Sequence, residues 1–244
     1  MARPLRRRQG RGRGPEGPRP LPDAGRGPAL LHRLRRDRAL LRRGRRLGVR
    51  GLSERLSSAI DAIDAANAED PNTVVVRGED LPLALAHGRL ASEWVGRLVP
   101  DADDALVLAA RAHHLRRWEV PRSSYPEGRA AYLRWRRDQK DRHAQEVVPI
   151  LLGAGYDEAT VNRVQVLLRR VRIDEASGTQ TIEDAACLAF LETQLADVAA
   201  RLDRDTLLRA LRRTAAKMTP AALSLVAEIP LDDSARDALT EALG

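Results

Sequence analysis

The sequence of 244 residues contains a single cysteine, Cys187, and no apolar run long enough to cross a membrane. One thiol cannot form an internal disulfide, which excludes a scaffold built on disulfide bridges and favours a reducing, cytoplasmic compartment. A transmembrane helix needs roughly 18–20 mostly apolar residues, and the start of the chain lacks the apolar core of a secretory signal. We therefore expect a cytoplasmic protein with no membrane partner.

Lysine is nearly absent, with two Lys against 40 Arg, and the charges are unevenly distributed. Residues 1–50 hold 17 Arg and three acidic residues, a net charge of +14. Residues 51–244 hold 25 basic and 31 acidic side chains, a net charge of −6. The high isoelectric point could suggest a nucleic-acid-binding protein, but that interpretation would depend on the amino-terminal segment alone.

Residues 1–49 are rich in Arg, Gly and Pro and contain no aromatic residue. Such a segment buries too little apolar surface to offset the entropy of ordering it, so we predict that it is disordered. Three interpretations are open: a basic arm for nucleic acid or anionic lipid, a targeting segment, or GC-rich sequence translated upstream of the true start. We favour the third, because no aromatic side chain is available to stack on bases.

From residue 50 onward the apolar residues recur with the period of an α-helix, which predicts one all-α domain over residues 50–244. Residues 73–76, Thr-Val-Val-Val, have the composition of a short strand, but the neighbouring sequence shows no partner for it. The predicted helices lie near residues 52–69, 83–98, 104–117, 128–153, 158–171, 181–202, 204–216, 220–228 and 232–242.

Few side chains of this domain are suited to metal binding or acid–base chemistry. His87, His113, His143 and Asp184 each share a face of a predicted helix with apolar residues, so all four point toward the interior. An unpaired carboxylate in an apolar core is costly, and convergence of imidazoles and a carboxylate on a divalent cation would remove that cost. The alternative is that each His is a hydrogen-bonded core residue and that Asp184 caps a helix or pairs with an Arg.

The order of these residues resembles the HD-domain superfamily of all-α, metal-dependent phosphohydrolases, over residues 83–198. The motifs are Ala-His-Gly-Arg-Leu-Ala, Arg-Ala-His-His, His-Ala-Gln-Glu-Val-Val and Ile-Glu-Asp-Ala-Ala-Cys-Leu. Members of that superfamily carry a His, a His-Asp pair ending an apolar helix, often further His, and a late Asp. Longer motifs such as Ala-His-Gly-Arg-Leu-Ala-Ser-Glu-Trp-Val also resemble an uncharacterised family of bacterial and fungal proteins, a domain of unknown function, over residues 55–243.

The resemblance to the HD domains implies a divalent-metal site held by His87, His113, His114 and Asp184. This chain has His114 where the superfamily has the Asp of the doublet. Because imidazole replaces a carboxylate, we expect a transition metal such as Zn, Fe, Mn or Co rather than Mg. The same replacement removes a negative charge that would help to position the attacking water.

The segment 115–143 concentrates cations together with two of the three Trp and two of the three Tyr of the chain. Arg and Lys bind phosphate oxygens, and aromatic rings stack on bases. The alternative is a solvated charged face whose aromatic residues lie in the core. The residues that we predict to bind substrate or phosphate are Arg116, Arg117, Trp118, Tyr125, Arg129, Arg136 and Lys140.

These observations predict a divalent-metal-dependent hydrolase of a phosphate-bearing small molecule, with a nucleotide as the favoured substrate and His143 or Glu183 moving a proton. Because the doublet lacks its Asp, a second hypothesis is a non-catalytic helical domain that binds a nucleotide or RNA through a degenerate HD-type site. The third hypothesis is a structural domain whose histidines only form core hydrogen bonds.

Overall fold

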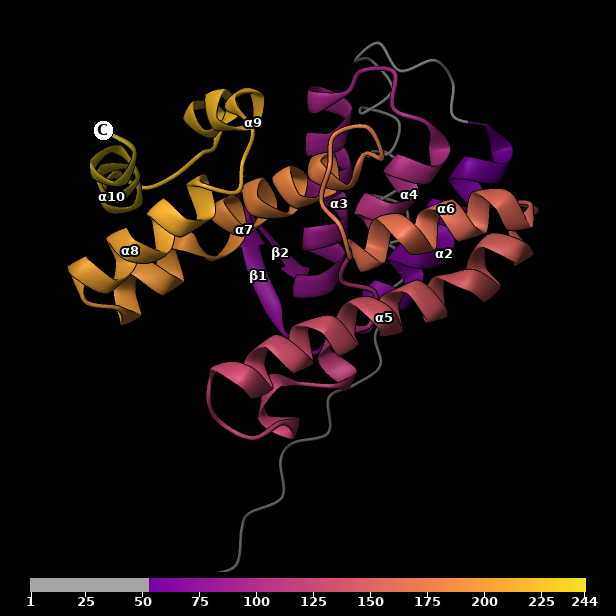
Figure 1. The fold of residues 1–244 in the computed structure, drawn as a ribbon, viewed down its shortest axis with the longest axis horizontal. Coiled ribbons are helices and arrows are strands. Elements are labelled where there is room, and N and C mark those ends of the chain that lie inside the picture. The colour runs from indigo at the N-terminus through magenta and orange to yellow at the C-terminus, as the bar shows by residue number, and fades with distance from the viewer. Residues whose placement is uncertain (1–52) are drawn as a thin grey trace, which may run out of the picture. The chain divides into compact units, whose positions relative to one another are not determined.

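The computed structural model describes residues 53–244, and the disorder predicted for residues 1–49 lies outside this range. The described residues form an all-α fold, as the sequence predicts, with the addition of one short hairpin (Figure 1). The helices are α2 (Glu54–Asn67), α3 (Leu83–Leu98), α4 (Asp104–Ala112), α5 (Arg129–Gly153), α6 (Glu158–Arg169), α7 (Thr179–Arg201), α8 (Arg204–Ala215), α9 (Pro220–Leu225) and α10 (Asp233–Leu243). Short 3-10 turns cover Arg117–Glu119, Arg122–Ser124 and Val226–Glu228.

Side-chain caps fix where most of these helices begin. At each such position a carboxylate or hydroxyl oxygen accepts a hydrogen bond from a backbone N–H of the first turn, a donor that has no partner within the helix. The capping residues are Ser53, Asp103, Asp157, Asp203, Thr219 and Asp232.

The strand predicted at 73–76 forms, but the expectation that it has no partner nearby was wrong. β1 (Thr73–Val76) pairs antiparallel with β2 (Glu79–Pro82), the segment that follows it directly. Arg77 and Gly78 connect the strands with φ angles of 50° and 84°. Two consecutive residues with positive φ make the tight turn that suits a two-residue hairpin. The sequence of β2, Glu-Asp-Leu-Pro, is poor in strand-forming residues, which is why it was missed.

The helix predicted over residues 104–117 ends early, which is a second correction. α4 stops at Ala112, His113 is its C-cap, and Arg116 adopts a left-handed conformation with φ of 48°. In a continuous helix, His113 and His114 would point about 100° apart around the axis. In the structure both imidazoles line one cavity.

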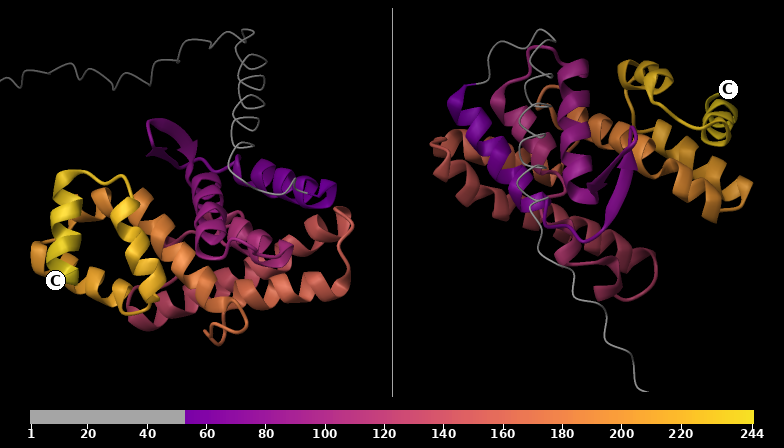
Figure 2. Two further views of the ribbon diagram at one scale, coloured as in Figure 1. Left: turned by 90° about the horizontal axis from the view of Figure 1, so that it is seen from above. Right: turned by 180° about the vertical axis from the view of Figure 1, so that it is seen from behind.

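α3, α4 and α7 form the centre of the packing, and α5 and α6 pack against each other as an antiparallel pair (Figures 1 and 2). Trp94 of α3, Leu108 of α4 and Leu188 of α7 are almost fully buried. α10 packs against α8 and α7 at the carboxyl-terminal end. Among residues 53–244, no helix combines the length and the apolar character that crossing a membrane requires.

Candidate metal centre

Three imidazoles meet where α3 faces the end of α4. His87 comes from α3, and His113 and His114 follow α4 directly. One ligand nitrogen from each ring lies within 4.8 Å of the other two, and the rings of His113 and His114 stack with their centroids 4.2 Å apart. Three nitrogens this close need only small side-chain rotations to hold one cation with bonds of about 2 Å.

Hydrogen bonding determines which nitrogen of His87 carries its proton. Thr193 of α7 donates its hydroxyl hydrogen to the carbonyl oxygen of Ala189, at 2.7 Å. The hydroxyl oxygen therefore accepts from Nε2–H of His87, at 3.0 Å. The lone pair of His87 consequently lies on Nδ1, which is buried and has no hydrogen-bond partner.

His113 is oriented in the same way by a backbone carbonyl. Its Nδ1 lies 2.8 Å from the carbonyl oxygen of Ala110, which can only accept, so Nδ1 carries the proton. Nε2 of His113 then bears the lone pair and, like Nδ1 of His87, is buried without a partner. Metal-binding histidines typically donate the N–H of the other ring nitrogen to a carbonyl or a side-chain oxygen, as these two do.

The environment keeps these imidazoles neutral. Burial lowers the pKa of His87 to about 4, with a further contribution from Arg117. Burial also lowers the pKa of His113 and His114 well below the ordinary value, and the neighbouring imidazoles add to the effect. A neutral imidazole is the form that binds a metal ion, so the site is prepared for a cation over the physiological pH range.

Asp184 does not join the three imidazoles, contrary to the predicted ligand set. Its Oδ1 accepts from the backbone N–H of Thr219 at 3.1 Å and from Nε2 of Gln180 at 2.9 Å. Its Oδ2 accepts from the hydroxyl of Thr219 at 2.6 Å. These three hydrogen bonds satisfy the buried carboxylate without a cation, and Asp184 lines a separate hollow beside the start of α9.

Both residues predicted to move a proton border the same cavity as the imidazoles. The ring of His143, from α5, lies 6.4 Å from that of His114, and neither of its nitrogens has a hydrogen-bond partner. Burial, followed by Arg117, lowers the pKa of His143 to about 3. Glu183 of α7 is buried, and its Oε2 lies 3.6 Å from Nη1 of Arg170.

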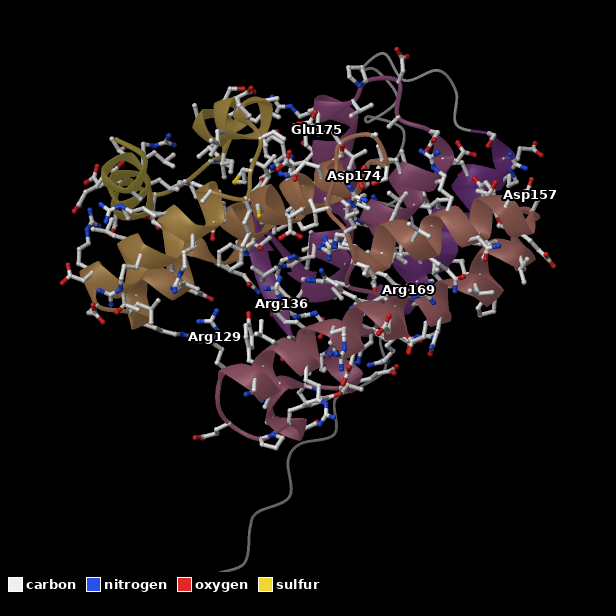
Figure 3. All side chains as sticks on the ribbon, viewed as in Figure 1. Arg129, Arg136, Asp157, Arg169, Asp174 and Glu175 are labelled. Carbon is white, nitrogen blue, oxygen red and sulfur yellow. The ribbon has the colours of Figure 1, made fainter. Side chains whose placement is uncertain are left out.

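The cavity has a volume of about 600 Å³ and receives four of the seven side chains predicted to bind substrate or phosphate. The three others lie elsewhere. Arg116 pairs with Glu119, and Tyr125 donates to Asp138. Arg129 is exposed at the start of α5, about 10 Å along the helix axis from Arg136 (Figure 3). The predicted residues that line the cavity are Arg117, Trp118, Arg136 and Lys140.

Several residues of the cavity wall were not predicted from the sequence. Arg170 follows α6 and Lys217 follows α8, and no pattern in the sequence connects these segments with the histidines. Tyr132 and Trp135 belong to the segment rich in Arg and Trp, where their helical positions could have identified them. The guanidinium groups of cavity arginines lie over both rings, at 4.4 Å from Trp135 and 5.9 Å from Tyr132.

Comparison with known proteins gives a family but no activity. A family model described as a domain of unknown function, DUF4202, matches residues 57–239. No curated protein and no solved structure matches the chain. Because the family model covers more than half of the chain, the protein belongs to the DUF4202 family.

Proposed function

We propose that the protein is a divalent-metal-dependent hydrolase of a phosphate-bearing small molecule, with a nucleotide as the favoured substrate. One observation carries the proposal. Nδ1 of His87 and Nε2 of His113 have buried, unpartnered lone pairs beside His114, at the wall of a cavity rich in cations. Orphaned acceptors of this kind are costly unless a ligand satisfies them.

The donor set fits a catalytic metal better than a structural one. Three neutral imidazoles leave a coordination position open, whereas structural sites are usually closed by four protein ligands. Imidazole donors select Zn, Fe, Mn or Co over Mg. Such a cation, when bound, supplies Lewis acidity and lowers the pKa of a coordinated water. His87, His113 and His114 would hold it.

The protein's own side chains would orient a phosphate beside the imidazoles. Arg117 and Arg136 line the cavity, and each guanidinium is held over an aromatic ring of α5. A planar guanidinium fixed in this way presents a fork of N–H donors to phosphate oxygens at little further cost in entropy. Trp118 and Tyr132, in the same wall, offer faces on which a nucleobase would stack.

Two groups are placed for proton transfer. Asp70, the other carboxylate among the described residues of the cavity wall, already accepts hydrogen bonds from Asn72 and from the backbone N–H of Ala84. Glu183 is therefore the carboxylate that would take a proton. His143 is neutral at rest, and a phosphate dianion in the cavity would raise its pKa and so allow it to carry a proton.

A non-catalytic binding protein is the second candidate, and Asp184 is the observation that favours it. Thr219 and Gln180 donate hydrogen bonds to that carboxylate, so Asp184 does not lie beside the three imidazoles as a ligand. The site would then hold a nucleotide or RNA without turning it over. Tight nucleotide binding with no release of phosphate from the metal-loaded protein would favour this candidate over the hydrolase.

The decisive experiment measures metal content by mass spectrometry on the full chain, purified without chelator. We expect about one transition-metal ion per chain, lost when His113 and His114 are both changed to Ala. Asp184→Asn is the matched control and should keep the metal, because the carboxylate of Asp184 is hydrogen-bonded to Thr219 away from the three imidazoles. Absence of metal after loading with Zn, Mn, Fe and Co would refute the metal site. Release of phosphate from a panel of phosphorylated compounds would then test the hydrolase activity.

A further inference from the structure

Arg170 is a buried cation in an unusual backbone conformation. It is the C-cap of α6 with a φ of 45°, in the left-handed region where helices commonly end in glycine. Its side chain is buried and lines the cavity, and Nε has no hydrogen-bond partner. Its Nη1 makes only long contacts, 3.4 Å to the carbonyl oxygen of Ile182 and 3.6 Å to Glu183. A buried and incompletely hydrogen-bonded guanidinium indicates a ligand site.

Both lysines of the chain line this same cavity. The sequence uses Arg 40 times and Lys twice, and the two lysines are Lys140 of α5 and Lys217 beyond α8. In a chain so biased toward Arg, the presence of both ammonium groups at one cavity points to a specific use. An ammonium is a compact point charge that binds phosphate, whereas the larger Arg fork needs more room.

These three cations gather around Glu183, near the start of α7. The carboxylate of Glu183 lies beside Arg170, near the start of α7, whereas His87 is anchored by Thr193 further along the same helix. Arg170 also contributes to lowering the pKa of His113 and His143, so this group of cations adjoins the imidazoles. Burial, followed by Arg170, lowers the pKa of Lys140 to about 8, a sign of like charges crowded without enough anions.

The charges of the cavity match two phosphates. Among residues 53–244, Glu183 is the one carboxylate of the cavity wall beside Lys140, Arg170 and Lys217, which leaves the equivalent of two positive charges. Arg117 and Arg136 supply two more positive charges to the same cavity, and neither pairs with a carboxylate of residues 53–244. A phosphate monoester carries between one and a half and two negative charges at neutral pH, according to the second pKa of about 6.

We propose that Lys140, Arg170 and Lys217 form a second anion subsite, so that the ligand of this cavity carries two or more phosphoryl groups. The inference rests on the proposed function in one respect, namely that another phosphoryl group lies at the imidazoles. The second subsite itself requires no metal.

The test compares inorganic tripolyphosphate with orthophosphate on the full chain. Metal is first removed with a chelator, because polyphosphates themselves bind divalent ions, and the affinities are measured by isothermal titration calorimetry. We expect tripolyphosphate to bind about tenfold more tightly than orthophosphate or better, since each additional charge-assisted contact contributes about a factor of ten. Lys217→Ala should weaken tripolyphosphate binding more than orthophosphate binding and so remove most of that preference.

Arg213→Ala is the matched control. Arg213 is exposed on α8, four positions before Lys217, and lies outside the cavity, so the change removes the same charge without touching the subsite. Equal affinities for the two anions in the wild type would overturn the inference. An equal loss in R213A and K217A would also overturn it, because the preference would then reflect general electrostatics. Because Lys217 is exposed, K217A should fold, which its melting curve checks.

A second variant separates this result from the fate of the metal site. Changing His113 and His114 to Ala should abolish metal binding but keep the preference for tripolyphosphate. If no metal is found but tripolyphosphate is still preferred, the second subsite is supported and the hydrolase proposal is refuted. If metal is bound but tripolyphosphate is not preferred, the second subsite is refuted and the hydrolase proposal is unaffected.

Discussion

Single hydrogen bonds determine which nitrogen of each buried imidazole is available to a cation. The hydroxyl of Thr193 is committed to the carbonyl oxygen of Ala189, so it can only accept from His87. The carbonyl oxygen of Ala110 does the same for His113. Both rings are thereby fixed with the lone pair on a buried nitrogen that has no partner, before any metal arrives.

Thr193→Val should therefore weaken metal binding although Thr193 is not a ligand. The valine side chain has nearly the same shape but no oxygen, so Nε2–H of His87 loses its acceptor and the ring loses its fixed tautomer. We expect metal affinity to fall about 10- to 100-fold, the usual effect of removing such a partner. Titration against a chromophoric chelator would measure it.

Thr193→Ser is the control for this prediction. Serine keeps the hydroxyl, so the affinity should remain close to that of the wild type, although a methyl group is lost. If the Val and Ser variants bind metal equally well, then packing rather than the hydrogen bond positions His87.

The side chains that approach the cavity were only partly predictable from the sequence. Helical periodicity correctly placed His87 and His113 toward the interior, but an inward face does not say which neighbour a side chain meets. Asp184 shows the limit of the method: it is buried as predicted, yet its carboxylate binds Thr219. Glu183, one position earlier, faces the cavity instead.

Helices α3 and α4 approach each other closely, which brings their histidines together. Gly88 permits this close approach. A Cβ atom added to Gly88 would lie 2.5 Å from the carbonyl oxygen of Arg111. Gly88 is the neighbour of His87, and Arg111 precedes His113 by two residues. The close contact between the two helix backbones therefore also sets the distance between their imidazoles.

Gly88→Ala should destabilise the protein by about 1–3 kcal/mol, because the new methyl group forces the two helices apart. It should also weaken metal binding, since His87 moves away with α3. Gly96→Ala is the control on the same helix: Gly96 is exposed, a Cβ there meets nothing within 4 Å, and Ala should stabilise by about 0.5–1 kcal/mol. Urea denaturation measures both changes, and equal stabilities of G88A and wild type would refute this account of the helix spacing.

Element types were predicted better than element ends. The helices from α5 onward begin and end close to their predicted positions, because caps such as Asp157 and Asp203 are visible in the sequence. The early end of α4 was not visible, since no glycine or proline marks it. That end depends on a tertiary contact, the backbone N–H of Arg116 donating to the side chain of Asn67 at 3.1 Å. Local sequence does not encode such a contact.

Across the whole domain, the four described histidines lie together in a cavity surrounded by cations, which links folding stability to pH. The pKa of every one of them is lowered, first by burial and then by neighbouring arginines or imidazoles. In the unfolded chain the same histidines titrate near pH 6.5. Between these values the unfolded state binds more protons than the folded state, so stability rises with pH.

The metal-free protein should therefore lose stability as the pH falls from 7 to 5, a range in which His87, with a pKa of about 4, stays neutral only while the chain is folded. We expect the melting temperature to fall by about 5 °C or more over this range. His143→Leu should flatten the dependence, because it removes one buried imidazole whose nitrogens have no partners. It should not destabilise the protein at pH 5, since Leu fills the same space without a polar group. A melting temperature of wild type that stays constant from pH 7 to 5 would mean that the folded protein holds these imidazoles protonated, a state in which they could not bind a metal.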